Sequence, residues 1–116
     1  MIKTLDDLKN ALRTFSTERD WEQFHSPKNL AMALGVEAAE LAEHFQWLTQ
    51  QESLNLSQEK LNAVSEELAD VLIYLVRMAD RLDVDLLAAA GKKITANAEK
   101  YPVDKSRGRW ERPNSR

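Results

Sequence analysis

The sequence predicts an all-α protein, an antiparallel four-helix bundle. The composition is the first observation: among 116 residues there are only three glycines and three prolines, while Ala, Leu, Glu and Lys are common, which favours helix over sheet. The second is that apolar residues recur at three- and four-residue intervals in four segments. Short polar links between these segments favour antiparallel neighbours.

The first two helices are predicted from their starts. Thr4 is a good N-cap for a helix that we expect to run to about Phe15, with an apolar stripe at Leu5, Leu8, Leu12 and Phe15. A polar connection follows over residues 16–26. Ser26 and Pro27 suit an N-cap and a first helical position, so the second helix should run from there to about Thr49.

The last two helices are predicted in the same way. Residues 50–56 are polar and predict a loop, after which Ser57 caps a third helix that reaches about Leu82. Asp85 caps a fourth helix that ends before Pro102. We therefore expect one helical domain over residues 1–102 and a flexible, basic tail over residues 103–116.

Charge and composition exclude several classes of protein. The formal net charge is −3, which gives no general reason to bind nucleic acid or anionic lipid. The absence of cysteine rules out disulfides and thiol catalysis. Neither a signal peptide nor an apolar run of membrane-spanning length is visible, so we expect a cytoplasmic protein with no membrane partner.

Two pairs of acidic residues lie on helix faces that are otherwise half apolar. Glu37 and Glu40 are three residues apart on the second helix, and Glu67 and Asp70 repeat this spacing on the third. Such pairs are usually found on a solvated helix face. Here their faces also carry large apolar or aromatic residues: Trp47 for the first pair, and Val71, Tyr74 and Met78 for the second. We therefore expect both pairs to be partly buried.

The third helix is apolar on two sides. One stripe consists of Leu61, Val64, Leu68, Leu72, Leu75, Ala79 and Leu82. The other contains Val71, Tyr74 and Met78, beside the acidic pair. We expect the chain itself to cover the first stripe and to leave the second for another copy, because one layer of four helices can cover only one of them. The sequence thus predicts a homo-oligomer, a dimer or a tetramer.

Buried carboxylates need a compensating charge, and a divalent metal ion would supply it. Lys28 and Arg77 are too few to pair with four acids. The four candidate ligands all offer oxygen, which favours Mg²⁺, or Mn²⁺ as a substitute, and points to phosphoryl chemistry. A di-iron centre is disfavoured because it uses Glu-x-x-His motifs on two helices of the bundle. The chain has two histidines: His25 follows Glu22 by three residues in the connection before the second helix, and His44 follows Glu40 by four.

With these motifs the chain resembles the all-α NTP pyrophosphohydrolases, the MazG-like and dimeric dUTPase superfamily, and within it the small dCTP pyrophosphatases. The resemblance covers about residues 5–103. Its segments, in chain order, are RDWEQFH (19–25), ELAEHFQW (40–47), EELADVLIYL (66–75), and Lys93, Asn97, Tyr101 and Pro102. It implies a hydrolase that cleaves nucleoside triphosphates to monophosphate and pyrophosphate and so cleans the nucleotide pool.

The resemblance also implies roles for individual residues. Glu37, Glu40, Glu67 and Asp70 would hold Mg²⁺ against the triphosphate while water attacks the α-phosphorus, with Glu37 or Glu40 orienting or deprotonating that water. The expected substrate-binding residues are Trp21, Trp47, Tyr74, Arg81, Lys93, Asn97 and Tyr101. From the pattern alone, Trp47 could instead fill a bundle end, and Arg81 could pair with Asp80 or Asp85.

One residue departs from the pattern of the cytosine-specific relatives. They carry a polar residue in the first helix where this chain has Leu12, so dCTP is only the first candidate substrate. The alternative interpretation is a non-catalytic, metal-binding helical module with a regulatory or interaction role. An assay for pyrophosphate release separates the two.

Overall fold

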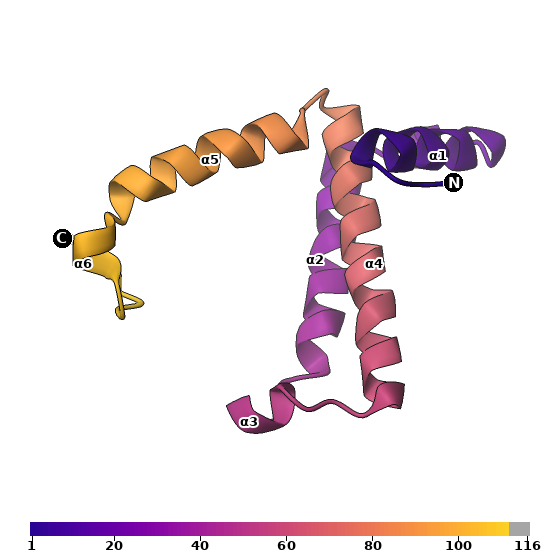
Figure 1. The fold of residues 1–116 in the computed structure, drawn as a ribbon. Coiled ribbons are helices and arrows are strands. Elements are labelled where there is room, and N and C mark those ends of the chain that lie inside the picture. The colour runs from indigo at the N-terminus through magenta and orange to yellow at the C-terminus, as the bar shows by residue number, and fades with distance from the viewer. Residues whose placement is uncertain (112–116) are drawn as a thin grey trace. The chain divides into compact units, whose positions relative to one another are not determined.

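The structure is a computed structural model that describes residues 1–111, and those residues form helices and no strand (Figure 1). The chain divides into two compact units, Met1–Asp83 and a second that starts at Val84. The elements of the first unit are α1 (Leu5–Glu18), η1 (Glu22–Phe24), α2 (Pro27–Glu43), α3 (Gln50–Ser53) and α4 (Gln58–Arg81). Those of the second are α5 (Leu86–Lys100) and α6 (Val103–Ser106). The predicted all-α class is confirmed.

The first unit is built on an antiparallel pair of helices. α2 and α4 lie side by side, α3 lies in the connection between them, and α1 packs against α4 (Figure 1). The buried apolar side chains are Leu30 of α2 and Val64, Val76 and Ala79 of α4. The contact between α2 and α4 therefore runs along the helices that carry the two acidic pairs.

The four predicted helix starts are confirmed, because an N-cap is a local feature of sequence. In each, the side-chain oxygen of the capping residue accepts a hydrogen bond from the backbone N–H three residues later. The capping residues are Thr4, Ser26, Ser57 and Asp85.

The predicted end of the second helix was wrong. α2 stops at Glu43, and turns lead to Thr49. Thr49 begins α3, because its hydroxyl accepts from the Glu52 backbone N–H (3.1 Å) while the Glu52 carboxylate accepts from the Thr49 N–H (2.8 Å). The loop predicted over residues 50–56 thus contains a short helix, and Trp47 lies in a turn instead of on the helical face of Glu40.

The two apolar sides of α4 are not covered as predicted, since only Val64 and Ala79 of the first stripe are buried. Glu67 and Asp70 face α2, and Val71, Tyr74 and Met78 beside them are half-buried. Five leucines of the other stripe are between 39% and 52% exposed, namely Leu61, Leu68, Leu72, Leu75 and Leu82. The acidic pairs of α2 and α4 lie against each other, so the face that carries them is the one the chain covers.

The second unit contains the last predicted helix. α5 ends at Lys100, before Pro102 as expected, and α6 follows within the segment for which a flexible tail was predicted. Residues 112–116 of that segment lie outside the described residues. No helix within residues 1–111 combines the length and the apolar character needed to span a membrane.

Candidate metal centre

Three carboxylates from two helices converge at the contact between α2 and α4. One oxygen each of Glu37, Glu67 and Asp70 lies within 4.8 Å of the others. The spacing of three residues turns Glu67 and Asp70 to one side of α4, and Glu37 meets them from α2. Such a set of oxygens can share one divalent cation.

Two oxygens of this group are buried without a hydrogen-bond partner, namely Glu37 Oε2 and Glu67 Oε2. In the described part of the chain, no ion pair reaches Glu37, Glu40, Glu67 or Asp70. Burying an unpaired carboxylate oxygen is energetically costly, and no Lys, Arg or His side chain in the described part of the chain forms an ion pair that offsets this cost. The all-oxygen donor set matches the preference of a hard divalent metal ion.

The fourth carboxylate, Glu40, lies beside Glu37 on α2. Its interaction with the Glu37 carboxyl group is the main reason why the pKa of Glu37 rises to about 7, and burial and the neighbouring Glu67 raise this pKa further. We call Glu37, Glu40, Glu67 and Asp70 the carboxylate cluster. The crowding of like charges favours protonation of Glu37 when no cation is bound.

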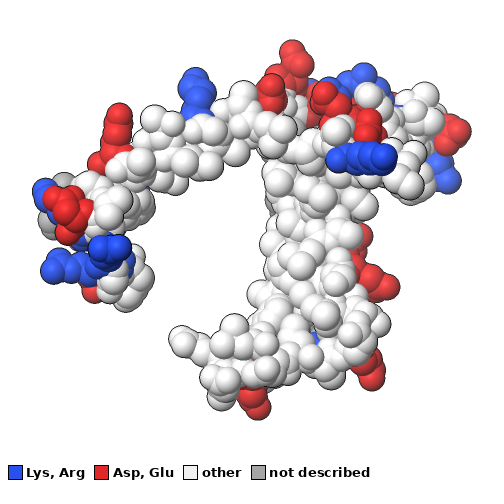
Figure 2. All heavy atoms as spheres, in the orientation of Figure 1, with Lys and Arg blue, Asp and Glu red and all other residues white. Residues whose placement is uncertain are grey.

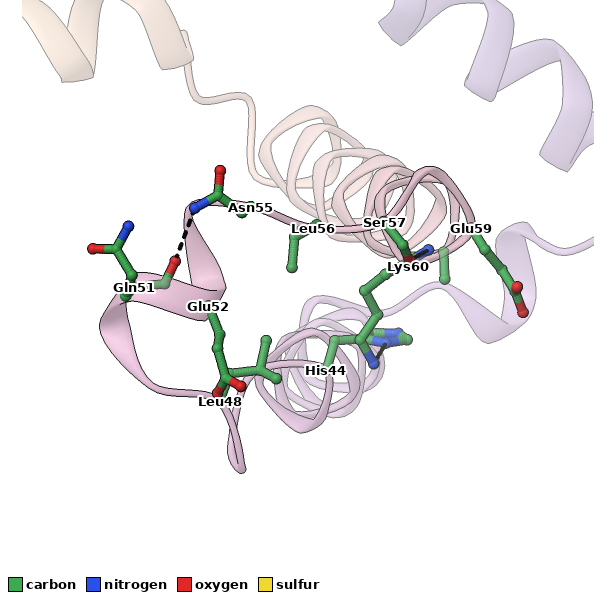
Figure 3. A pocket seen from close by; sticks show the side chains of 10 residues that line it. His44, Leu48, Gln51, Glu52, Asn55, Leu56, Ser57, Glu59 and Lys60 are labelled. Carbon is green, nitrogen blue, oxygen red and sulfur yellow. Dashed lines mark hydrogen bonds between the residues drawn. The ribbon is translucent and has the colours of Figure 1, made fainter.

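A cavity of about 770 Å³ lies between the end of α2, α3 and the start of α4 (Figure 3). His44, one turn after Glu40, lines it together with Lys60 of α4, and His44 Nδ1 lies 3.4 Å from Lys60 Nζ. Sequence analysis did not single out Lys60. The capping box at Thr49 was the signal that could have found the cavity, because it ends α2 early and turns the chain at this point.

The two tryptophans predicted to bind substrate are both exposed. Trp21 lies just before η1, is 42% exposed, and its ring contacts those of Phe15 (centroids 5.7 Å apart) and His25 (6.0 Å). Trp47 is 86% exposed in the turns that follow α2. Tyr74 is half-buried on α4, one turn after Asp70.

The other predicted contacts lie at the end of α4 and in the second unit. Arg81 donates to Glu22 Oε2 at 2.8 Å, not to Asp80 or Asp85. Lys93 and Asn97 lie on α5 and Tyr101 caps its end, where the Tyr101 N–H donates to the Asn97 carbonyl oxygen (2.7 Å). The substrate roles of these residues stay predictions.

A second group of charged residues, which the sequence patterns did not reveal, lies around the end of α4. Arg77 is buried and donates to Glu22 (2.5 Å) and Asp80 (3.2 Å), and Arg13 of α1 donates to the second Asp80 oxygen (2.5 Å). We call Arg13, Glu22, Arg77, Asp80 and Arg81 the arginine cluster. Arg77 and Asp80 could have been found as a pair at helical spacing, but Glu22 is 55 residues away in the chain.

Comparison with known proteins agrees with this arrangement. Residues 32–112 match the model of the MazG-like family. The dCTP pyrophosphatase 1 of Rattus norvegicus is 48% identical over 107 residues, and that of Homo sapiens is 47% identical over 106. These alignments cover 90% of this chain but only 63% and 62% of the relatives, so the chain spans less than two thirds of their length.

A solved structure shows the same fold. The crystal structure of a pyrophosphatase from Archaeoglobus fulgidus superposes with a TM-score of 0.81 at 37% identity, over 88% of this chain and 95% of that one. The family match includes all four carboxylates. This chain belongs to the MazG-like family.

Proposed function

We propose that the protein is a Mg²⁺-dependent hydrolase of nucleoside triphosphates that releases monophosphate and pyrophosphate. Relatives that share nearly half of its sequence are named dCTP pyrophosphatases, which makes dCTP the first candidate substrate. The expected setting is the cytoplasmic nucleotide pool. The observation that carries the proposal is the carboxylate cluster, with three oxygens within 4.8 Å and two buried oxygens that lack a partner.

The carboxylate cluster would hold the metal, with Glu37, Glu67 and Asp70 as shared ligands and Glu40 beside them. When bound, Mg²⁺ supplies charge stabilisation for the triphosphate and lowers the pKa of coordinated water; Mn²⁺ is a chemically similar substitute. Glu37 or Glu40 orients the attacking water and accepts its proton. A carboxylate held beside the metal is suited to act as a general base for this step.

Aromatic rings and hydrogen-bond donors are the proposed substrate contacts. Trp21 and Trp47 present exposed rings on which a base can stack. The remaining proposed contacts, which offer hydroxyl, amide or cationic groups to phosphate and sugar, are Tyr74, Arg81, Lys93, Asn97 and Tyr101. The cavity lined by His44 and Lys60 offers further room for a ligand.

Incubation with each dNTP and Mg²⁺, with separate assays for pyrophosphate and inorganic phosphate, tests the proposal. We expect pyrophosphate as the first product and faster turnover of dCTP than of the purine nucleotides. Inorganic phosphate as the first product would mean attack at the γ-phosphorus and would contradict the proposal. A flat profile across the dNTPs would remove dCTP as the preferred substrate, in line with Leu12 in place of a polar residue. Metal binding without hydrolysis would favour the non-catalytic module.

We further propose that the enzyme works as a homo-oligomer, at least a dimer, that covers the exposed leucines of α4. Leu61, Leu68 and Leu72 are 45%, 52% and 42% exposed along one side of α4. The view of the first unit in Figure 2 shows Lys, Arg, Asp and Glu gathered over α1, whereas the stretch of α2 and α4 that faces the viewer is almost free of charged residues. Exposed leucines that recur along one side of a helix are typical of a subunit interface.

Sedimentation at micromolar concentration tests this interface. Leu72→Glu should shift the protein towards the 13.3 kDa species, since it places a charge in the centre of the face. Leu54→Glu is the matched control, because Leu54 is 76% exposed and lies outside the α4 stripe. A fully active wild-type species of 13.3 kDa would contradict the proposal.

A further inference from the structure

Arg77 is buried and forms hydrogen bonds with other residues of the first unit. Only 3% of its side chain is exposed. Its Nε donates to His25 Nδ1 (3.1 Å), Nη1 to an Asp80 oxygen (3.2 Å) and Nη2 to Glu22 Oε1 (2.5 Å). A buried guanidinium is costly unless its charge is paired and its N–H groups form hydrogen bonds. These bonds therefore hold the Arg77 side chain in one orientation.

Arg77 and Arg81 together connect α4 to η1. Arg81 donates to Glu22 Oε2 while Arg77 donates to Oε1, so each carboxylate oxygen of Glu22 faces its own guanidinium. Within residues 1–111, every side-chain hydrogen bond between residues 19–25 and α4 ends on one of these two arginines. The position of η1 relative to α4 therefore depends on Glu22 and His25 being held.

Trp21 lies in the segment that these bonds hold. It directly precedes Glu22, and its backbone N–H donates to the Ser16 carbonyl oxygen (2.9 Å). Its ring packs edge-to-face with the His25 ring at an interplanar angle of 62°. His25 is itself the acceptor for Arg77. The Trp21 ring thus rests on a residue fixed by the arginine, while 42% of Trp21 stays exposed to solvent.

We propose that Arg77 is a positioning residue for substrate: by binding Glu22 and His25 it fixes the Trp21 ring in the orientation that stacks on the nucleotide base. Arg77 follows Asp70 by seven residues and Tyr74 by three, so the three share one stripe of α4. In this proposal α4 carries both Asp70, a ligand of the metal, and Arg77, which positions the ring that contacts the base. This inference rests on the proposed function, in which Trp21 contacts the base.

The first test needs no nucleotide. In a Trp47→Phe/Trp110→Phe background Trp21 is the single tryptophan, and acrylamide quenching reports how well its ring is held. Glu22→Gln and Arg77→Lys should each raise the quenching constant about twofold, because neither preserves the charge-assisted bonds that link Arg77 to Glu22. Arg13→Lys is the matched control: Arg13 is 54% exposed and binds Asp80, the side of the arginine cluster away from η1.

The second test uses the same three substitutions in the chain with all its tryptophans. For Glu22→Gln and Arg77→Lys the KM for dCTP should rise about tenfold, with kcat within about threefold, because ground-state grip on the base is lost and the metal chemistry is kept. Arg13→Lys should change neither constant. Urea unfolding of each variant confirms that it is folded under the assay conditions.

These outcomes separate the inference from the proposed function. Quenching and KM unchanged from wild type in both test variants would overturn the inference, as would an equal effect of Arg13→Lys or a fall in kcat at constant KM. A wild-type protein that hydrolyses no nucleoside triphosphate would overturn the proposed function. In that case the quenching arm alone decides whether Arg77 holds Trp21.

Discussion

Two clusters of charged side chains share α4 and differ in how their charges are balanced. The carboxylate cluster brings four acids together with no ion pair among the described residues, and leaves two buried oxygens without partners. In the arginine cluster, three arginines alternate with two acids at distances of 2.5 to 3.2 Å. The charges of the arginine cluster are paired with one another, and those of the carboxylate cluster are not.

The pKa directions express the same difference. In the carboxylate cluster, the Glu40 carboxyl, burial and Glu67 raise the pKa of Glu37 to about 7. In the arginine cluster, the hydrogen bond and charge of Arg13 lower the pKa of Asp80 below its ordinary value. The arginine cluster pairs its charges within the protein, whereas the carboxylate cluster brings like charges together. The carboxylate cluster is therefore the candidate site for a cationic ligand.

The largest expected effect comes from removing one charge of the carboxylate cluster. Glu67→Gln should lower kcat/KM for dCTP by about a thousandfold, because several kcal/mol of transition-state charge stabilisation are lost with the metal. Glu66→Gln is the control, since Glu66 is the exposed neighbour. Steady-state kinetics at saturating Mg²⁺ measure both. Equal rates for the two variants would remove Glu67 from the site.

Breaking the arginine cluster should affect stability instead. Arg77→Met should lower the free energy of unfolding by about 3 kcal/mol, because it leaves two carboxylates short of a buried partner. Arg81→Met, at a position with 37% side-chain exposure, should cost less than about 1 kcal/mol. Urea titrations followed by circular dichroism compare them. Similar losses in the two variants would show that burial of Arg77 is not what matters.

The smallest effect is the pH dependence of the metal-free protein, in which the clusters act in opposite directions. The pKa of Glu37 is raised from 4.5 to about 7, so its contribution to stability is full below 4.5 and is lost as pH rises through 7. The pKa of Asp80 is lowered from 3.8, so its contribution is present above 3.8 and is lost as pH falls through the lowered value.

Thermal unfolding in EDTA measures these two contributions. Between about pH 5 and about pH 8 the Tm of the wild type should fall, and Glu37→Gln should flatten this fall. Below about pH 4 the wild type should lose stability more steeply than Asp80→Asn. A wild-type Tm that rises between pH 5 and pH 8, with the same slope in Glu37→Gln, would show that the carboxylates do not crowd one another.

The features predicted from sequence are those set by neighbours along the chain. Thr4 and Ser57 begin helices because an N-cap satisfies backbone groups three residues away, and the spacing of Glu67 and Asp70 places both on one face. The early end of α2 was missed because Thr49, which suits a cap, was placed at the end of a helix instead of the start of one.

The features missed depend on long-range contacts. Periodicity identified both apolar sides of α4 but could not tell which faces α2, because that depends on contacts with a helix far away in the sequence. The pairing of Arg77 with Glu22 spans 55 residues and leaves no local pattern. The same holds for the substrate contacts proposed on α5. The spacing of Lys93 and Asn97 places them on one stripe, but local sequence does not specify what contacts that stripe.

The central claim is that the carboxylate cluster, and not the arginine cluster, holds a divalent metal ion. Mn²⁺ titration followed by electron paramagnetic resonance tests it directly on the wild type, Asp70→Asn and Asp80→Asn, which remove one acid from each cluster on the same helix. We predict that the wild type and Asp80→Asn bind Mn²⁺ alike and that Asp70→Asn binds it at least about tenfold more weakly. Equal binding by the wild type and Asp70→Asn, or equal loss in both variants, would contradict the account.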